Sequence, residues 1–196
     1  MLDIVTILQR TQDFFVQQEI DSPRLDAELL LCHLLNMERL DLYLKFDQPL
    51  TNSELTQLRS LVRRRGNREP MAWIIGQKGF YKHDFIVTPD VLCPRPDTET
   101  LVEVALQLIP EHQETFLADI GCGSGCIGLS LALERPNSKL FAVDIADEAI
   151  NCTKQNVRRF SLEKRVAVLK GPFLSAIPEH RQIDVLVSNP PYIPSA

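Results

Sequence analysis

Glycines alternate with small residues directly after a predicted strand that ends in an acid. Asp119 is followed by Ile120 and then by a loop made of Gly121, Cys122, Gly123, Ser124 and Gly125. Glycine has no Cβ, so a ligand can approach the backbone of this loop and the N-terminus of the following helix. The close spacing and the preceding acid favour a nucleoside without a pyrophosphate, whose charged amino-acid tail can meet Asp119. The overlapping glycine spacing over residues 123–128 also matches the dinucleotide fingerprint, so an NAD-dependent enzyme remains open.

A second acid stands where a ribose could be bound. Asp144 lies 25 residues after Asp119, at the end of the next predicted strand. An ionised carboxylate has two acceptor oxygens and can accept a hydrogen bond from each hydroxyl of a ribose. Together with the glycine loop, Asp144 predicts a ribose-bearing ligand, either NAD or S-adenosylmethionine.

The segment Asn189–Tyr192 (Asn-Pro-Pro-Tyr) follows a predicted apolar strand, at the carboxyl end where ligands of open α/β sheets bind. An amide or amine nitrogen next to a carbonyl or a ring is a poor nucleophile because its lone pair is delocalised. The side-chain oxygen of Asn189 and the carbonyl of Pro190 can each accept one N–H of such a nitrogen and favour its pyramidal form. Pro190 and Pro191 have no N–H that would compete for these acceptors, and Tyr192 can stack on a flat substrate group. This motif favours S-adenosylmethionine over NAD.

Apolar strands alternate with helical segments over the C-terminal part of the chain. Strands are predicted over Thr115–Ile120, Leu140–Val143, Val166–Leu169 and Ile183–Val187, with helices starting near Ser124 and near Asp147. Nearly continuous apolar strands separated by helices are typical of a parallel sheet covered on both faces. The predicted fold class is therefore α/β with a Rossmann-like sheet.

The first 75 residues are predicted to form a small helical bundle. Thr51 and Glu54 fit a capping box, and apolar residues from Leu25 to Leu34 recur at helical spacing, with His33 as a core or boundary residue. Glycines, aromatic residues and prolines between 76 and 96 predict a β-hairpin connector. We therefore expect a helical domain over 1–75, the connector over 76–96 and a sheet domain over 97–196.

Composition excludes several classes of protein. The chain has 196 residues, of which 44% are hydrophobic and 24% charged, with a net charge of −5. This balance is typical of a soluble globular protein and disfavours a direct nucleic-acid substrate, because nucleic-acid binders carry a basic surface. No apolar run is long enough for a membrane span, and the N-terminus lacks the pattern of a signal peptide. The five cysteines, without partners at metal-finger spacing, predict free thiols in the cytoplasm and no metal site.

The motifs DIGCGSG, AVD and SNPPY, in this order, resemble those of class I S-adenosylmethionine-dependent methyltransferases that act on a planar nitrogen. The stretches GQKGFYKHDFIV and CPRPDTETLVE narrow the resemblance to the HemK-type glutamine methyltransferases, and it covers almost the whole chain. The resemblance implies S-adenosylmethionine as cofactor and peptide-chain release factors as partners. The enzyme would methylate the side-chain amide nitrogen of the glutamine in their Gly-Gly-Gln motif, and the helical N-terminal domain would dock the substrate.

The resemblance also implies roles for single residues. Residues 121–125 and Asp144 match the cofactor loop and the ribose-binding acid, and residues 189–192 match the glutamine-binding motif. Within that motif the expected catalytic residues are Asn189, Pro190 and Tyr192, with Asn189 also next to the cofactor.

Other positions match the family less closely. Phe173 falls where relatives have an aromatic residue near the adenine, although the neighbouring Pro172 stands where an acid is expected. Arg95, Thr98 and Glu99 are expected to close the site around the methionine end or the substrate. Their individual roles do not follow from the sequence.

One departure from the family concerns the sheet. The methyltransferase sheet has seven strands, whereas the fourth predicted strand here is followed by only a few residues before Ala196. An open apolar edge strand is a liability for solubility. We therefore expect a C-terminally truncated sheet, with weak or absent turnover from this polypeptide by itself.

Alternative functions remain open from the sequence. Within the same chemistry they are a glutamine methyltransferase for a ribosomal protein and an amino-methylase for a nucleic-acid base. From other classes they are an NAD-dependent oxidoreductase and a non-catalytic fragment that binds a partner through its helical bundle.

Overall fold

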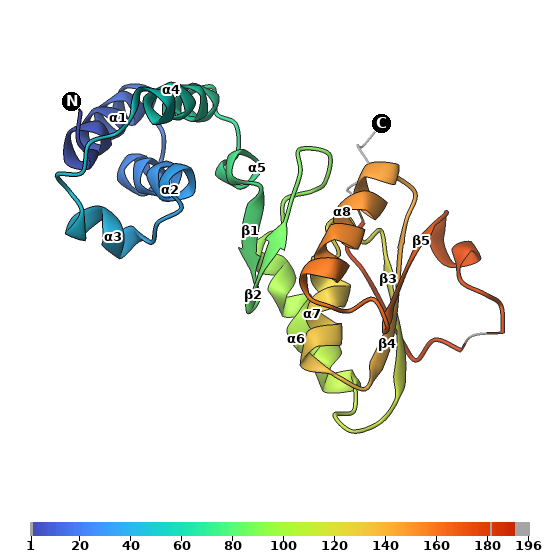
Figure 1. Cartoon of the computed structure of the whole chain (residues 1–196). Helices are drawn as coiled ribbons and strands as arrows, with labels where there is room; N and C mark the ends of the chain where they lie inside the picture. Colours follow the sequence, from blue (N-terminus) through green and yellow to red (C-terminus); the bar gives the residue numbers. More distant parts are fainter. Residues whose placement is uncertain (1, 181, 191–196) are drawn as a thin grey trace. The chain divides into compact units, whose positions relative to one another are not determined.

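The structure of the chain is a computed structural model that describes residues 2–180 and 182–190 (Figure 1). It divides into two compact units, Met1–Ile75 and Gly76–Ala196. Each unit has its own hydrophobic core, so each is described by itself.

The first unit is helical. Its described helices are α1 (Ile4–Gln17), α2 (Pro23–Leu35), α3 (Arg39–Leu44), α4 (Asn52–Gly66) and α5 (Met71–Ile75). The capping box predicted at the start of α4 is confirmed, because the Glu54 carboxylate accepts the Thr51 N–H at 2.7 Å and the Thr51 hydroxyl accepts the Glu54 N–H at 3.3 Å. Helix α2 packs against both α1 and α4, and this contact builds the core of the unit.

The apolar stripe predicted on α2 is only partly confirmed: Leu30 is buried, but the two ends of the stripe are not. Leu25 and His33 are exposed, and the buried face is formed by Ala27, Leu30 and Leu31. Leucines lie around much of the circumference of this helix, so spacing alone does not single out one apolar face. The contacts with neighbouring helices decide which leucines are buried.

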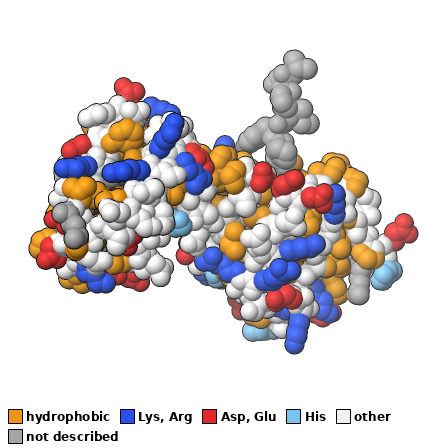
Figure 2. Space-filling model, turned by 45° about the horizontal axis from the view of Figure 1, so that its top comes forward, with side chains coloured by type: hydrophobic (Ala, Val, Ile, Leu, Met, Phe, Trp, Pro, Cys, Tyr) orange, Lys and Arg blue, Asp and Glu red, His pale blue; other side chains and the backbone are white. Residues whose placement is uncertain are grey.

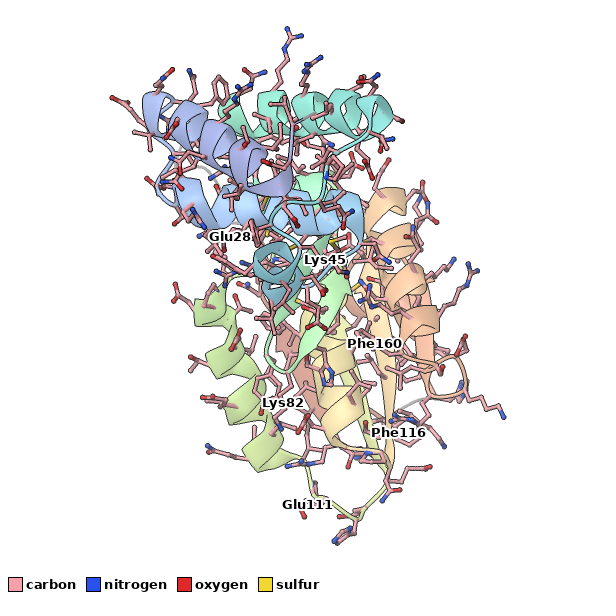
Figure 3. The ribbon with its side chains drawn as sticks, turned by 60° about the vertical axis from the view of Figure 1, so that its left-hand side comes forward. Glu28, Lys45, Lys82, Glu111, Phe116 and Phe160 are labelled. Atoms are coloured by element: carbon pink, nitrogen blue, oxygen red, sulfur yellow. The ribbon has the colours of Figure 1, made fainter. Side chains whose placement is uncertain are left out.

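The buried face of α2 also carries an acid, Glu28 (Figure 3), whose side chain is 1% exposed. Its Oε1 accepts hydrogen bonds from Arg24 and from the Tyr43 hydroxyl, both at 2.6 Å, and its Oε2 accepts from Arg39 at 2.9 Å and 2.5 Å. Burial by itself raises the pKa of this carboxyl. The hydrogen bonds from Tyr43, Arg24 and Arg39 outweigh burial and hold the pKa at about 2.

We expect Glu28→Gln to lower the free energy of unfolding by about 2 kcal/mol at pH 7, because the amide leaves two guanidinium groups without their anion. Arg24 and Arg39 are about half exposed, which keeps the loss below that of a fully buried pair. The folded-state pKa is lowered, so this stabilisation is present above about pH 4.5 and is lost as the pH falls towards 2.

Urea unfolding followed by the fluorescence of Trp73, the single tryptophan of the chain and a residue of α5, measures this effect. Glu111→Gln, at an exposed carboxylate, is the control. A difference between wild type and Glu28→Gln that stays the same at pH 7 and pH 3 would contradict the pairing.

The second unit begins with the hairpin β1 (Gln77–Phe80) and β2 (His83–Ile86), followed by η1 (Pro96–Thr98) and α6 (Glu99–Leu108). The remaining elements are β3 (Thr115–Ile120), α7 (Cys126–Glu134), β4 (Ser138–Asp144), α8 (Asp147–Arg159), β5 (Val166–Lys170), η2 (Phe173–Ala176) and β6 (Val185–Ser188). The sheet formed by β3 to β6 is parallel throughout, in the order β5-β4-β3-β6. The α/β prediction is confirmed.

The two faces of this sheet are covered by different kinds of segment. Helix α7 contacts α6 and α8, and all three lie on the same side of the sheet (Figure 1). Right-handed crossovers that step in one direction along a sheet leave their helices on one face, and β3-α7-β4-α8-β5 takes two such steps. On the opposite face the described residues provide Ile177 and its neighbours, packed on Ala118, Ile120 and Val143.

The surface gives little indication of a ligand on its own. Charged side chains of both signs are interspersed with hydrophobic ones on the face shown in Figure 2. Within the described ranges, no helix has the length and apolar character needed to cross a membrane, and no group of three or more His, Cys, Asp or Glu is placed to hold a metal ion. All five cysteines are free thiols.

Candidate functional site

The candidate residues lie at the carboxyl ends of the parallel strands. Phe173 follows β5, Asp144 ends β4, the loop of residues 121–125 follows β3 and Asn189 follows β6. Because the strand order is β5-β4-β3-β6, these residues form a row along one edge of the sheet. Neighbouring strands are about 4.8 Å apart, so the row is roughly 14 Å long.

The glycine loop has the backbone that its sequence predicts. Gly121, Gly123 and Gly125 have φ values of 72°, 56° and 79°, a region that other residues rarely adopt. A Cβ added at Gly121 or Gly123 would meet no atom of the described residues within 4 Å. The space beside these two positions is therefore open to a ligand.

The loop is anchored from below by buried groups. The N–H groups of Gly121 and Cys122 donate to the carbonyl of Val143, and the Thr153 hydroxyl donates to the carbonyl of Gly123 at 2.9 Å. The Cys122 side chain is buried, and burial raises the pKa of its thiol far above the usual value. Ser124 is buried as well. The side chains of these two residues therefore do not lie on the open surface of the loop.

Asp144 is joined directly to the glycine loop. Its Oδ2 accepts the Gly123 N–H at 2.9 Å, and its Oδ1 accepts the Ala146 N–H at 3.1 Å. The carboxylate is held by the backbone on both sides, and each oxygen keeps a second lone pair for a ribose hydroxyl. Two exposed apolar side chains flank this position in the row, Ile145 at 69% exposed and Phe173 at 77%.

Asp119 lies beneath the loop rather than on its surface. Its side chain is fully buried, its Oδ2 accepts the Gly128 N–H at 2.9 Å, and its Oδ1 has no hydrogen-bond partner among the described residues. Burial raises the pKa of this carboxyl to about 7; the Gly128 hydrogen bond lowers it and the charge of Asp144 raises it. A cationic group of a ligand would have to reach Oδ1 through the loop.

Gly128 fits between Asp119 and the sheet. A Cβ at this position would lie 2.9 Å from Asp119 and 2.9 Å from Leu140. We expect Gly128→Ala to destabilise the protein by about 1–3 kcal/mol, although alanine is the better helix former by about 1 kcal/mol. Urea unfolding measures this, with Gly79→Ala, where the new Cβ would make only an ordinary contact, as control. Equal stability of Gly128→Ala and wild type would contradict this packing.

Asn189 is oriented by the segment before α6. Its Nδ2 donates to the Thr98 hydroxyl at 3.2 Å, which leaves Oδ1 as an acceptor. Glu99 next to Thr98 accepts the Tyr81 N–H at 3.0 Å and so ties this segment to the hairpin, whereas Arg95 is exposed. Pro190 is exposed; Pro191 and Tyr192 lie outside the described residues.

A buried asparagine on α8 connects the hairpin to the glycine loop. The Oδ1 of Asn156 accepts the Ile86 N–H at 2.7 Å, and its Nδ2 donates to the carbonyls of Ile86 and Ser124, both at 2.9 Å. Phe160 at the end of α8 (Figure 3) packs on Phe85 of the hairpin, with ring centroids 5.1 Å apart. The hairpin is therefore part of the support of the site.

Two family descriptions match the chain: residues 6–76 match the PrmC N-terminal domain and residues 95–195 match the methyltransferase small domain. A protein of Chlorobaculum tepidum named release factor glutamine methyltransferase is 38% identical over 98% of this chain and 68% of its own length. A protein of the same name from Nitratidesulfovibrio vulgaris is 37% identical over 97% of this chain and 64% of its own length. This chain belongs to the release factor glutamine methyltransferase family. It spans about two thirds of the length of these relatives.

Among solved structures, the human methyltransferase 10 domain containing protein is 23% identical over 56% of this chain and 54% of that chain, with a TM-score of 0.49. Membership of the release factor glutamine methyltransferase family decides between the two ligands that the glycine spacing allowed. The cofactor of this family is S-adenosylmethionine and not NAD.

The described residues fit such a cofactor. The space beside Gly121 and Gly123 is not filled by described side chains and can receive a ligand, and Asp144 offers two acceptor oxygens for a ribose. Thr98 and Glu99 were expected at the site only because of the family resemblance. The structure shows a hydrogen-bond partner for each: Thr98 accepts from Asn189, and Glu99 accepts from Tyr81. Ile145 and Asn156 were not predicted from the sequence at all.

Proposed function

We propose that this protein transfers a methyl group from S-adenosylmethionine to the side-chain amide nitrogen of the glutamine in the Gly-Gly-Gln motif of peptide-chain release factors. The observation that carries the proposal is the position of Asn189. Its carboxamide follows β6, next to β3 and the glycine loop, and its Nδ2 donates to the Thr98 hydroxyl, so that Oδ1 can accept from a substrate. An acceptor there suits a planar N–H donor such as a glutamine amide.

The row along the sheet edge gives an order for the parts of the cofactor. In this proposal Phe173 and Ile145 contact the adenine, Asp144 binds the ribose, and residues 121–125 receive the methionine part. This order runs from β5 to β3, so the methyl group would lie at the end of the cofactor that is nearest to β6. Asn189 stands at that end of the row, so the donor and the acceptor of the methyl group meet there.

In the proposed mechanism the protein orients the nitrogen and does not need a general base. The Asn189 Oδ1 and the Pro190 carbonyl accept the two N–H groups of the substrate amide, which favours a lone pair directed at carbon. When bound, S-adenosylmethionine supplies an electrophilic methyl group. The methylated nitrogen is positively charged and therefore acidic, so its extra proton can pass to water. Pro191 and Tyr192 are proposed to enclose the glutamine.

The proposal also assigns the regions of the chain. Residues 1–75 dock the release factor, and residues 97–196 bind the cofactor and the glutamine. Residues 76–96 form the connector between these two regions. Because release factors act during translation, the proposed location is the cytoplasm.

A methylation assay with mass spectrometry tests the proposal. The protein is incubated with S-adenosylmethionine and a release factor, its variant with the motif glutamine replaced by alanine, ribosomal proteins, or adenine- and cytosine-containing nucleic acid. We expect one added methyl group on the motif glutamine, formed slowly because this polypeptide by itself is expected to have weak turnover, and none on the release factor variant. Methylation of only a ribosomal protein or a base would overturn the proposed substrate. Failure to bind S-adenosylmethionine in a titration would support the non-catalytic alternative.

A further inference from the structure

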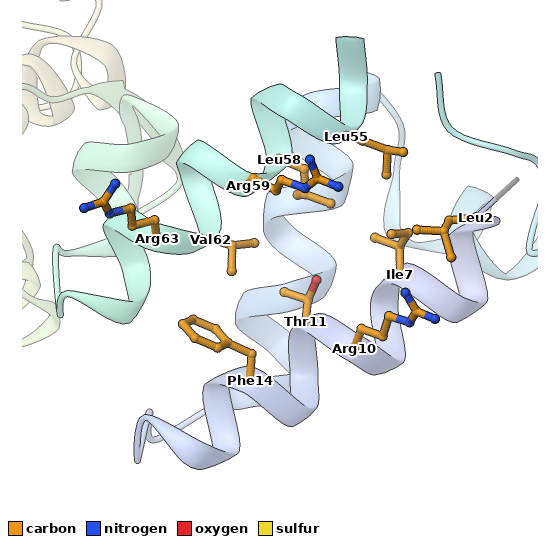
Figure 4. Close-up of a pocket in the computed structure, with 10 residues that line it drawn as sticks. All are labelled: Leu2, Ile7, Arg10, Thr11, Phe14, Leu55, Leu58, Arg59, Val62 and Arg63. Carbon is orange, nitrogen blue, oxygen red and sulfur yellow. The ribbon is translucent and has the colours of Figure 1, made fainter. Parts of the chain in front are cut away.

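A groove with a cavity volume of about 280 Å³ runs between α1 and α4 in the helical unit (Figure 4). Ile7 from α1 and Leu58 from α4 are buried in its floor. Phe14, Leu55 and Val62 lie beside them and are only partly buried. The floor is therefore an apolar surface that remains accessible between two helices.

The rim of this groove is basic. Arg10 projects from α1, and Arg59 and Arg63 project from α4 (Figure 4). All three side chains are exposed, and none makes a hydrogen bond or an ion pair with another described residue. No acid is among the residues that line the groove.

Neighbouring arginines of α4 behave differently. Arg64 pairs with Glu69, and Arg65 pairs with Asp26 at 2.6 Å. Ion pairs within the unit thus account for Arg64 and Arg65 but not for Arg59 and Arg63. The cations that remain unpaired are those that face the groove.

We propose that this groove binds an acidic amphipathic segment of the protein substrate. Apolar side chains of the segment would contact the floor formed by Ile7, Leu58 and their neighbours, and its carboxylates would pair with Arg10, Arg59 and Arg63. An amphipathic helix in a groove between two helices is a common mode of peptide recognition. Arginine suits this role because its guanidinium binds carboxylates in a two-bond geometry.

Other ligand classes fit the groove less well. A small-molecule site usually encloses most of the surface of its ligand, whereas this groove has an accessible apolar floor and exposed arginines along its rim. Single-stranded nucleic acid needs exposed aromatic rings on which bases stack, and Phe14, the aromatic residue of the groove, is partly buried against Gly66. Charge on the rim and an apolar floor together favour a peptide.

This inference rests on the proposed role of residues 1–75 in docking. It adds the surface that is used and the chemistry of the segment that it receives. Attraction between the rim and an acidic segment also predicts a salt dependence, since exposed charges are screened within about 8 Å at physiological ionic strength.

Binding to a synthetic peptide tests the groove independently of the function. The probe is an amphipathic peptide of leucine and glutamate, and its control is the same peptide with lysine in place of glutamate. We expect Arg59→Glu/Arg63→Glu to weaken binding of the acidic peptide at least tenfold, and raised salt to weaken binding to the wild type. Lys154→Glu, at an exposed lysine of the other unit, is the charge control and leaves affinity unchanged.

The same proteins are then compared for affinity to a release factor. A tenfold or greater loss with the double arginine variant supports the inference, and an unchanged affinity overturns it. Failure of the wild type to bind the acidic peptide also overturns it, as does preference for the lysine peptide or for RNA. If the acidic peptide binds through the arginines but no release factor is bound or methylated, the groove stands and the proposed function fails.

Discussion

Asn189→Ala is expected to lower kcat for methyl transfer by about a thousandfold while S-adenosylmethionine affinity stays close to that of the wild type. The variant removes one of the two acceptors that hold the glutamine amide, and each group that stabilises a transition state in this way contributes about 10²–10³ in rate. Cofactor affinity depends instead on Asp144 and the loop of residues 121–125. Single-turnover methylation and a separate cofactor titration measure the two quantities.

The orientation of Asn189 can be tested through its neighbour. Thr98→Val removes the hydroxyl that accepts the Asn189 Nδ2–H, so we expect a smaller loss of kcat, of about tenfold, and an unchanged cofactor affinity. Thr98→Ser restores the hydroxyl and should restore the rate. A normal rate in Asn189→Ala, or an equal effect of valine and serine at position 98, would show that this contact does not position the acceptor.

The parallel sheet was predictable because its strands are strongly apolar and end at polar residues. The predicted strand Thr115–Ile120 agrees with β3, and the helix predicted to start near Asp147 agrees with the start of α8. The last strand is displaced, because Ile183 lies before β6 rather than in it. Strand ends depend on hydrogen bonds to a partner strand, and these do not follow from one segment of sequence.

The row of ligand-binding candidates was also predictable, since each residue directly follows an apolar strand. The residues that hold this row in place were not predictable. Asn156 lies on the buried face of α8 with Cys152 and Thr153, and a polar residue on such a face is the only signal that the sequence offers. Thr98 and Asn189 are 91 positions apart, so their contact could not be predicted from local patterns.

Side-chain burial on α2 was the least predictable feature. Glu28 is buried on a helix where Leu25 is exposed, which reverses the usual preference of both residue types. The reversal depends on Arg24, Arg39 and Tyr43, which reach the carboxylate from α2 and α3. Ion pairs between α2 and α3 therefore determine which face of α2 is buried, and hydrophobic spacing alone does not predict it.

Asn156→Ala is expected to destabilise the protein by roughly 3 kcal/mol and to weaken S-adenosylmethionine binding about tenfold. The substitution removes three hydrogen bonds and leaves the Ile86 N–H and the Ser124 carbonyl without this partner, at a cost of about 1–3 kcal/mol for each buried group. Asn151→Ala is the matched control, since this asparagine is exposed on the same helix. Urea unfolding and cofactor titration measure both effects.

A purely structural role for Asn156 would lower stability without linking the hairpin to the cofactor loop. If Asn156 links the hairpin to the cofactor loop, cofactor binding should slow hydrogen exchange at the Ile86 amide in the wild type and in Asn151→Ala. It should not do so in Asn156→Ala. Asn156→Asp adds a test of hydrogen-bond direction, because a carboxyl group has a proton to donate to the Ile86 or the Ser124 carbonyl only when it is protonated. Asn156→Asp should therefore be less stable at pH 8 than at pH 5 relative to wild type, and the opposite trend would contradict the assignment of Nδ2 as the donor.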